Sequence, residues 1–308
     1  MFPKVNQLSS LNNWDSELTH NLFDTSFNDQ CISAIDAFMF NNKELNKLIF
    51  EPTEKISDIK ELIISGNLDD TTGRKIIALL SVPVSNPRFL NLILLGYISS
   101  VEAYFRQLIR NLVNLDQYVK QNCELQPINY GTTYYQTCDM FPESLMDGTT
   151  FIKSDNIKNE CNKLLGVSIQ VTKKSSLEVA FKDFDSICQL RHCIVHRFGK
   201  IGVNNIIKLG IHKEDFKDCI EKPITMNFNA IQKASKITVN IVRELNQTIW
   251  THVMKRLQNS EPPTWTWDLR SDKSQFRKYL NVFYESSLGP VEQNMKSIYD
   301  EYRKIKDE

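Results

Sequence analysis

The sequence predicts a mainly α-helical protein, a helical bundle with further helical segments on either side. Glycine is scarce, at 10 of 308 residues, which disfavours folds with many tight turns, such as sandwiches and propellers. The clearest indication is one stripe of apolar residues spaced alternately four and three positions apart, the period of a single helix face. The stripe comprises Leu94, Ile98, Val101, Phe105, Leu108, Leu112 and Leu115.

The first half of the chain contains one long helix with less regular segments before and after it. Residues 1–88 are expected to be helical in pieces that end at Pro83 and Pro87, because proline interrupts a helix. The apolar stripe predicts a helix over residues 89–118. Residues 121–151 are polar, aromatic and punctuated by glycine and proline, which predicts a long ordered loop.

The second half predicts four more helices from the same period. These helices cover residues 176–196, 227–257, 273–285 and 290–304. Between the first two, residues 200–211 alternate enough in polarity to favour one or two short strands. The sequence therefore predicts helices along most of its length.

We divide the chain into a helical N-terminal region (1–88), a central helical domain (89–258) and a C-terminal helical extension (259–308). Lysine plus arginine and aspartate plus glutamate number 37 each, so the formal net charge is zero. This balance argues against a protein that holds nucleic acid or an anionic membrane by bulk attraction. The charge is uneven, however, with a net −4 over residues 1–88 and +5 over residues 89–260.

The cysteines and the apolar segments bear on the compartment. Seven cysteines without a CxxC spacing do not indicate a secreted disulfide scaffold. The start of the chain lacks the basic and apolar runs of a signal peptide. The most apolar stretch, residues 89–105, is broken by polar side chains and is too polar to span a bilayer. We expect a soluble, cytoplasmic protein.

The strongest indication of function lies in residues 188–199. On a helical wheel, Arg191 falls at the centre of the apolar arc of its helix, where a core helix normally carries leucine. A guanidinium cannot lose its charge, so burial requires an anionic partner or an anionic ligand. His192 and His196 lie on the flank of the same arc. An arginine in an apolar stripe beside two histidines is unusual for a structural helix.

The spacing from Arg191 to His196, Arg-His-Cys-Ile-Val-His, resembles the Rx4-6H motif of HEPN domains. The helix that carries Glu102 is similar to the first HEPN helix, which often has an acidic residue facing the motif. The resemblance covers residues 89–258. It implies a helical bundle that forms a homodimer, in which two motifs share one active-site cleft. Many such proteins are metal-independent endoribonucleases of toxin–antitoxin, abortive-infection and other antiviral defence systems.

The resemblance also implies roles for individual residues. His196 would transfer protons, Arg191 would stabilise the phosphate, His192 would support them, and Glu102 would pair with Arg191. The expected substrate is RNA, whose own 2′-OH is the nucleophile, so neither a cofactor nor a metal is needed. An antitoxin or regulatory protein is a further expected partner, and no membrane is involved. Some HEPN toxins carry a tyrosine, which a partner nucleotidyltransferase modifies, where this chain has Phe198; this difference disfavours such a partner.

Other interpretations of the same residues stay open. The chain could be a non-catalytic HEPN-like module that binds nucleotide, RNA or a protein, and Arg191 could have only a structural role. Cys188, His192 and His196 are spaced so that they could hold a structural zinc ion on one helix face. Five aromatic residues could stack on bases but are favoured as packing residues: Tyr130, Tyr134, Tyr135, Trp265 and Trp267.

Overall fold

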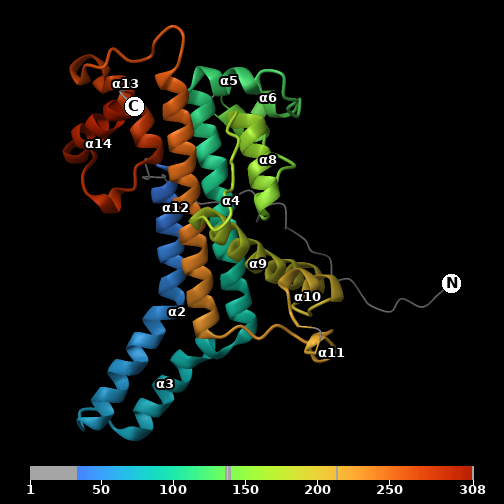
Figure 1. Cartoon of the computed structure of the whole chain (residues 1–308). Coiled ribbons are helices and arrows are strands. Elements are labelled where there is room, and N and C mark those ends of the chain that lie inside the picture. Colours follow the sequence, from blue (N-terminus) through green and yellow to red (C-terminus); the bar gives the residue numbers. More distant parts are fainter. Residues whose placement is uncertain (1–32, 136, 138–139, 213, 307–308) are drawn as a thin grey trace, which may run out of the picture. The chain divides into compact units, whose positions relative to one another are not determined.

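The computed structural model describes residues 33–135, 137, 140–212 and 214–306, and most of these residues are helical (Figure 1). The mainly α-helical fold is therefore confirmed. The helices within the described residues are α2 (Ala34–Ile64), α3 (Asp70–Ser85), α4 (Pro87–Leu115), α5 (Gln117–Cys123), α6 (Thr132–Tyr135), α7 (Phe141–Ser144), α8 (Ser154–Leu165), α9 (Ser176–Arg197), α10 (Val203–Leu209), α11 (Phe216–Cys219), α12 (Phe228–Gln258), α13 (Leu269–Phe283), the 3-10 helix η2 (Ser286–Leu288) and α14 (Val291–Lys306).

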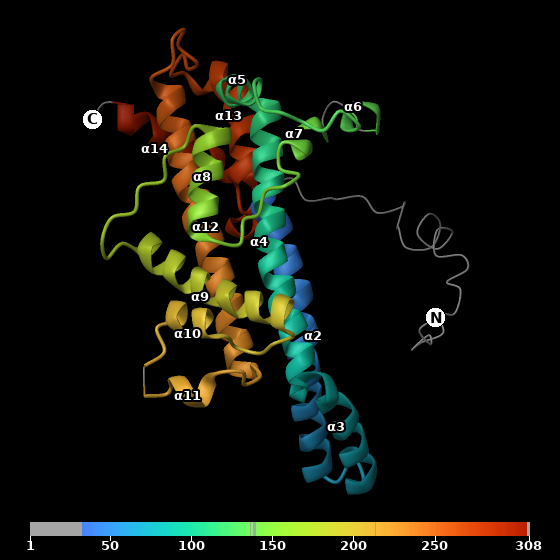
Figure 2. The same ribbon diagram turned by 90° about the vertical axis from the view of Figure 1, so that its right-hand side faces the viewer.

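Three long helices, α2, α4 and α12, run side by side and form the centre of the bundle (Figures 1 and 2). Each begins with a side-chain cap. Ser33, Asn86 and Asn227 accept a hydrogen bond from a backbone N–H two or three residues later, which satisfies a donor that the first turn leaves free. Helix α9 packs against both α4 and α12. The helix with the candidate site is therefore fixed to the centre of the bundle.

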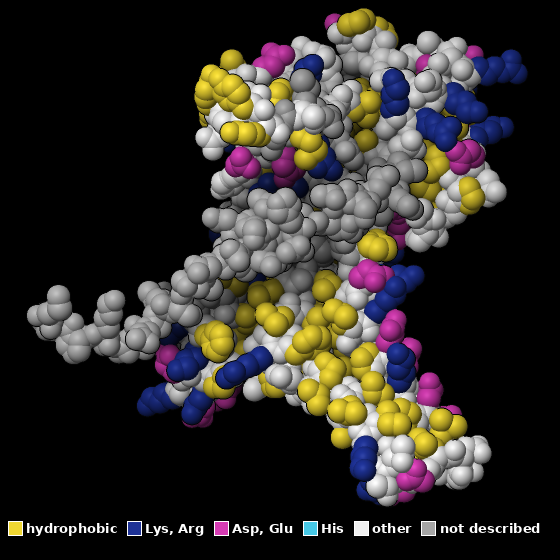
Figure 3. Space-filling model, turned by 180° about the vertical axis from the view of Figure 1, so that it is seen from behind, with side chains coloured by type: hydrophobic (Ala, Val, Ile, Leu, Met, Phe, Trp, Pro, Cys, Tyr) yellow, Lys and Arg dark blue, Asp and Glu magenta, His cyan; other side chains and the backbone are white. Residues whose placement is uncertain are grey.

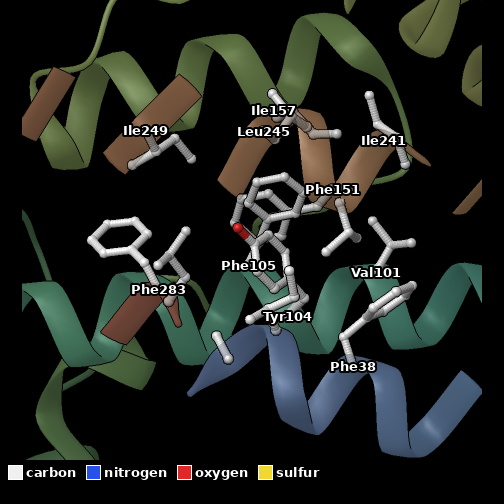
Figure 4. Packing of buried hydrophobic residues seen from close by; sticks show 14 of the residues in the cluster. Phe38, Val101, Tyr104, Phe105, Phe151, Ile157, Ile241, Leu245, Ile249 and Phe283 are labelled. Carbon is white, nitrogen blue, oxygen red and sulfur yellow. The ribbon is translucent and has the colours of Figure 1, made fainter. Parts of the chain in front are cut away.

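The core is densely aromatic on the face that α4 turns inward. Tyr104 and Phe105 are fully buried, and the Phe105 ring stacks on Phe151 with 5.1 Å between the ring centroids. Figure 4 shows side chains from α2, α4, α8 and α12 meeting around Phe105. Burial of these apolar side chains is the main favourable contribution to folding, because each large side chain that is fully buried contributes roughly 1.5–3 kcal/mol.

The expected helices with a continuous apolar stripe match the structure closely. Helices α4, α9 and α12 begin and end within three residues of the predicted bounds. Pro83 lies inside α3, which ends at Ser85, so the expected break at this proline is wrong. Pro87 instead opens α4 at its first turn, where a missing N–H costs nothing.

The expected strands over residues 200–211 are absent from this described segment. Residues 203–209 form α10, and the only β pairing nearby is an isolated bridge between Lys200 and Pro223. Helix α10 ends at Gly210, which is in the left-handed conformation with φ of 69°, a backbone state that glycine adopts readily. The apolar residues at 203, 206 and 207 have the i, i+3, i+4 spacing of one helix face, and the glycine cap ends that helix.

One cluster of buried side chains extends from Ala34 on α2 to Tyr302 on α14, so helices from all three predicted regions contribute to one core. The division at residues 88 and 258 stays a prediction. Within the part of the chain that the structure describes, no single helix is long and apolar enough to cross a membrane. Helices α3 and α4, bent by 52° at their junction, meet that criterion of length and composition only as a pair.

Candidate active site

Helix α9 is buried most deeply at its middle and reaches the surface at its C-terminal end. Ser175 caps its start by accepting a hydrogen bond from the Glu178 N–H at 3.2 Å. Phe184 and Cys188 on its apolar stripe are buried, whereas Phe198, which follows the last residue of the helix, is 83% exposed. The stripe therefore leaves the core in the last two turns, which are the turns that carry the motif.

Arg191 lies on this stripe, as the sequence predicts, and its side chain is half-buried. None of the ion pairs within 4.0 Å among the described residues involves Arg191. Glu102 instead accepts a hydrogen bond from the backbone N–H of Phe151 at 3.2 Å. The expected ion pair between Glu102 and Arg191 is thus not formed, because the loop before α8 supplies Glu102 with another donor.

Arg191 and Glu102 nevertheless lie in the same region, since both act on the Cys188 thiol. Burial raises the pKa of this thiol well above its usual range, and the charge of Asp185 raises it further. Arg191 lowers and Glu102 raises the same pKa by smaller amounts. Cys188 is therefore a buried, neutral thiol on the apolar face of α9.

His192 and His196 are neighbours on the exposed side of α9, one helical turn apart. Their ring centroids are 4.6 Å apart, and the ring planes are inclined by 49°. The pKa of His192 is lowered, first by partial loss of hydration and then by the positive charges of His196, Lys208 and Arg191. The structure thus brings together the two predicted histidines and places cationic groups near them.

Helix α10 supplies Lys208, a residue that the sequence interpretation missed. The amide of Asn205 on α10 donates a hydrogen bond to Gln189 on α9 at 3.4 Å. Ile206 on α10 also packs into a small cluster with Cys193 of α9. The glycines at positions 202 and 210 mark the two ends of this short helix. They were the sequence signal that could have indicated a helix carrying Lys208.

The end of α9 meets the beginning of α4. The side chain of Asn91 is buried beside Gly199, and its Oδ1 atom has no hydrogen-bond partner. The guanidinium of Arg88 lies over the Phe198 ring, 5.5 Å from its centroid. Backbone hydrogen bonds from Ile224 to Gly199 and from Ile201 to Lys222 hold the segment after α9 in place. The motif therefore sits on a fixed end of the helix.

The zinc interpretation has no geometric support. Cys188 is buried while His192 is exposed, so the three proposed ligands do not converge on one point. The described residues contain no group of three histidine, cysteine or acidic side chains placed to hold a metal ion. The structure thus gives no reason to assign a metal here.

The five aromatic residues divide into two groups. Trp265 is buried and contacts Phe276, and Trp267 contacts Tyr302, so both tryptophans are packing residues, as predicted. Tyr130, Tyr134 and Tyr135 are exposed on or beside α6, and the rings of Tyr130 and Tyr134 contact each other edge-on, so none of these three packs into the core.

Comparisons of the chain with protein-family models, with curated protein sequences and with solved structures found no match. By its fold and geometry, the chain is a mainly α-helical protein with two neighbouring histidines at the exposed end of a helix that packs against the core.

Proposed function

We propose that the protein is a metal-independent endoribonuclease that cleaves RNA by attack of the 2′-OH on the adjacent phosphate. One observation carries the proposal. His192 and His196 lie side by side on an exposed helix face, with the positive charges of Arg191 and Lys208 near them. This combination offers proton transfer and phosphate stabilisation in one place.

The reaction needs only groups of this kind. The bond between O2′ and phosphorus forms while the bond between phosphorus and O5′ breaks. A base takes the proton of the 2′-OH, and an acid gives a proton to the leaving O5′, so the products carry a 2′,3′-cyclic phosphate and a 5′-OH. Negative charge develops on the phosphoryl oxygens, where a guanidinium can donate two hydrogen bonds.

We assign proton transfer to His196 and stabilisation of the developing charge to Arg191. His192 supports them, because its lowered pKa favours a neutral ring that adds no second positive charge beside His196. Glu102 does not hold Arg191 directly in this assignment. It fixes the N-terminal side of Phe151 against α4, and so belongs to the packing around the site.

A second copy of the chain would supply the second proton-transfer group, and the surface supports such a homodimer. Val195 and Phe198 next to the motif are exposed, as are Leu92 on α4 and Leu79 and Val82 on α3. Figure 3 shows many hydrophobic side chains over the hairpin of α2 and α3 and the surface next to it. Apolar surface of this kind is typical of an interface. In a symmetric dimer each His196 would face its counterpart in one shared cleft.

The decisive experiment compares His196→Ala and Arg191→Ala with the wild type on single-stranded RNA. His252→Ala is the matched control, because His252 is exposed on α12 and its ring hydrogen-bonds to the Thr248 carbonyl of the same helix. We expect His196→Ala and Arg191→Ala to lose cleavage while thermal unfolding and oligomeric state stay unchanged, and the control to retain cleavage. EDTA is expected to have no effect.

Two results would contradict the proposal. Products with a 3′-OH would exclude attack by the 2′-OH, and cleavage that survives in both variants would exclude the assigned residues. Binding of RNA or nucleotide through Arg191 without any cleavage would support the alternative, a non-catalytic binding module. A toxin or defence role in the cytoplasm, with an antitoxin as partner, belongs to the same proposal. It predicts that expression arrests growth and that His196→Ala relieves the arrest.

A further inference from the structure

We propose that the groove between α8, α9 and α10 binds the phosphate backbone of the RNA strand and leads it to the histidine pair. This inference rests on the proposed function and extends it by naming where the substrate lies. The groove is an open hollow of about 830 Å³. Its lining residues come from these helices and the segments next to them, and Figure 2 shows α8 on one side of α9 and α10 on the other.

The groove runs along α9 toward the candidate active site, whose histidines lie beyond its lining. Glu178, Lys182, Ser186 and Gln189 line it and follow one another along α9 at spacings of four, four and three, so they share one helix face. The next residues on that face are His192 and His196. Lys208 lines the groove and is close enough to His192 to lower its pKa. A strand lying in the groove would therefore reach the histidines at its end.

The cations of the groove come from different elements. Lys153 and Lys158 line it at the start of α8, Lys182 on α9 and Lys208 on α10. The first two form ion pairs with Asp155, at 2.6 and 3.3 Å. Lys182 and Lys208 are exposed and take part in none of the ion pairs found among the described residues. These two lysines are the ones available to a phosphate.

The acidic residues of the groove are already engaged by the protein. Asp185 accepts hydrogen bonds from the backbone N–H and the hydroxyl of Ser154, at 2.8 and 2.5 Å, and so caps the first turn of α8. Glu178 accepts from the backbone N–H of Lys174 at 2.5 Å. Their charges face backbone donors, which reduces their opposition to an anionic ligand.

The neutral lining suits a single nucleic-acid strand. Gln189 and Ser186 offer hydrogen-bonding groups, while Val171 and Leu209 offer apolar contact; Phe181 is buried beneath Lys158. A positively charged groove that follows the backbone is part of the usual arrangement for single strands bound without sequence preference. An acidic peptide would use the same cations but would have no reason to end at a proton-transfer site, so we favour RNA.

The test measures binding separately from cleavage. Single-stranded polyuridine labelled with fluorescein is titrated with the full chain carrying His196→Ala, so that the RNA stays intact. We expect Lys182→Glu with Lys208→Glu to weaken binding by about tenfold or more, as loss of backbone contacts does. Lys120→Glu with Lys236→Glu changes the charge equally on exposed positions of α5 and α12 outside the groove, and is expected to change binding less than about twofold.

The salt dependence gives a second, independent readout. Replacing both groove lysines by alanine should reduce the slope of log K against log salt by about 0.7 for each lysine, the value for single strands. Equal weakening by the groove pair and the control pair would overturn the proposal, as would competition by polyglutamate as effective as that by unlabelled RNA. Loss of binding with the groove pair, in a protein that does not cleave RNA, would uphold the groove and reject only the endoribonuclease.

Discussion

Arg256 near the end of α12 provides the sharpest test of the fold, because it forms a buried ion pair with Asp116 between α4 and α5. One guanidinium nitrogen lies 2.7 Å from the Asp116 carboxylate, and another donates to the Leu165 carbonyl at 3.1 Å. The side chain of Asp116 is 2% exposed and that of Arg256 22%. The guanidinium also covers the Tyr118 ring, 4.2 Å from its centroid. One side chain thus connects three helix ends.

We expect Arg256→Met to lower the free energy of unfolding by about 3–5 kcal/mol, because it leaves the buried carboxylate of Asp116 without a cation. For a domain of this size, the melting temperature should fall by at least about 6 °C. Arg74→Ala is the control, since its ion pair with Asp70 is exposed, with 77% and 59% of the two side chains accessible. Loss of such a pair costs about 0.5 kcal/mol or less.

The measurement is urea unfolding of the full chain followed by circular dichroism, with the slope of the transition compared between variants. A second arm adds Asp116→Asn to Arg256→Met. Asparagine removes the charge and retains the oxygen that accepts from the Val119 N–H, so the double variant should regain about 2 kcal/mol. The reasoning is refuted if Arg256→Met costs less than about 1 kcal/mol, or if the double variant is no more stable than the single one.

Two further predictions follow from backbone geometry and from charge. Gly166 has φ of 63°, and a Cβ atom there would lie 2.6 Å from the Tyr118 ring, so Gly166→Ala should destabilise the fold by more than about 1 kcal/mol; Gly131→Ala, where a Cβ meets open space, should change stability little. Lys208→Ala removes one charge that lowers the pKa of His192, so an NMR titration of the His192 ring should show that pKa rising, and an unchanged value would contradict the geometry. Because the folded protein holds the His192 proton less tightly than the unfolded chain does, this residue reduces stability as pH falls through about 6.5, and Lys208→Ala should lessen that loss.

The fold could be predicted where one apolar stripe continues for several turns. Helices α4, α9 and α12 have this property, and their bounds follow from the period alone. Helix α8 could not be recognised in the same way, because its apolar stripe is short, comprising Ile157, Cys161 and Leu164. Part of its stability comes from outside the segment, since its first N–H is capped by Asp185 of α9.

The same distinction, between features set by the helical period and features set by packing, applies to the candidate site. The proximity of His192 and His196 follows from their separation by four residues on one helix, so it was predictable from the sequence. The hydrogen-bond partner of Glu102 and the nearness of Lys208 depend on how a loop and a short helix pack against α9. Contacts between elements distant in the chain leave no periodic signal, so the spacing of apolar residues could not predict them.

The exposure of Arg191 changes the argument for its role. A fully buried guanidinium requires an anion from the protein, and a structural arginine held by Glu102 would meet that need. The structure leaves Arg191 half-buried and pairs Glu102 with a backbone N–H. Water can then stabilise part of the charge in the free protein, and no protein anion has to be displaced before a phosphate binds. An arginine on an apolar stripe that reaches the surface beside two histidines is thus better placed to meet a ligand than to hold the core together.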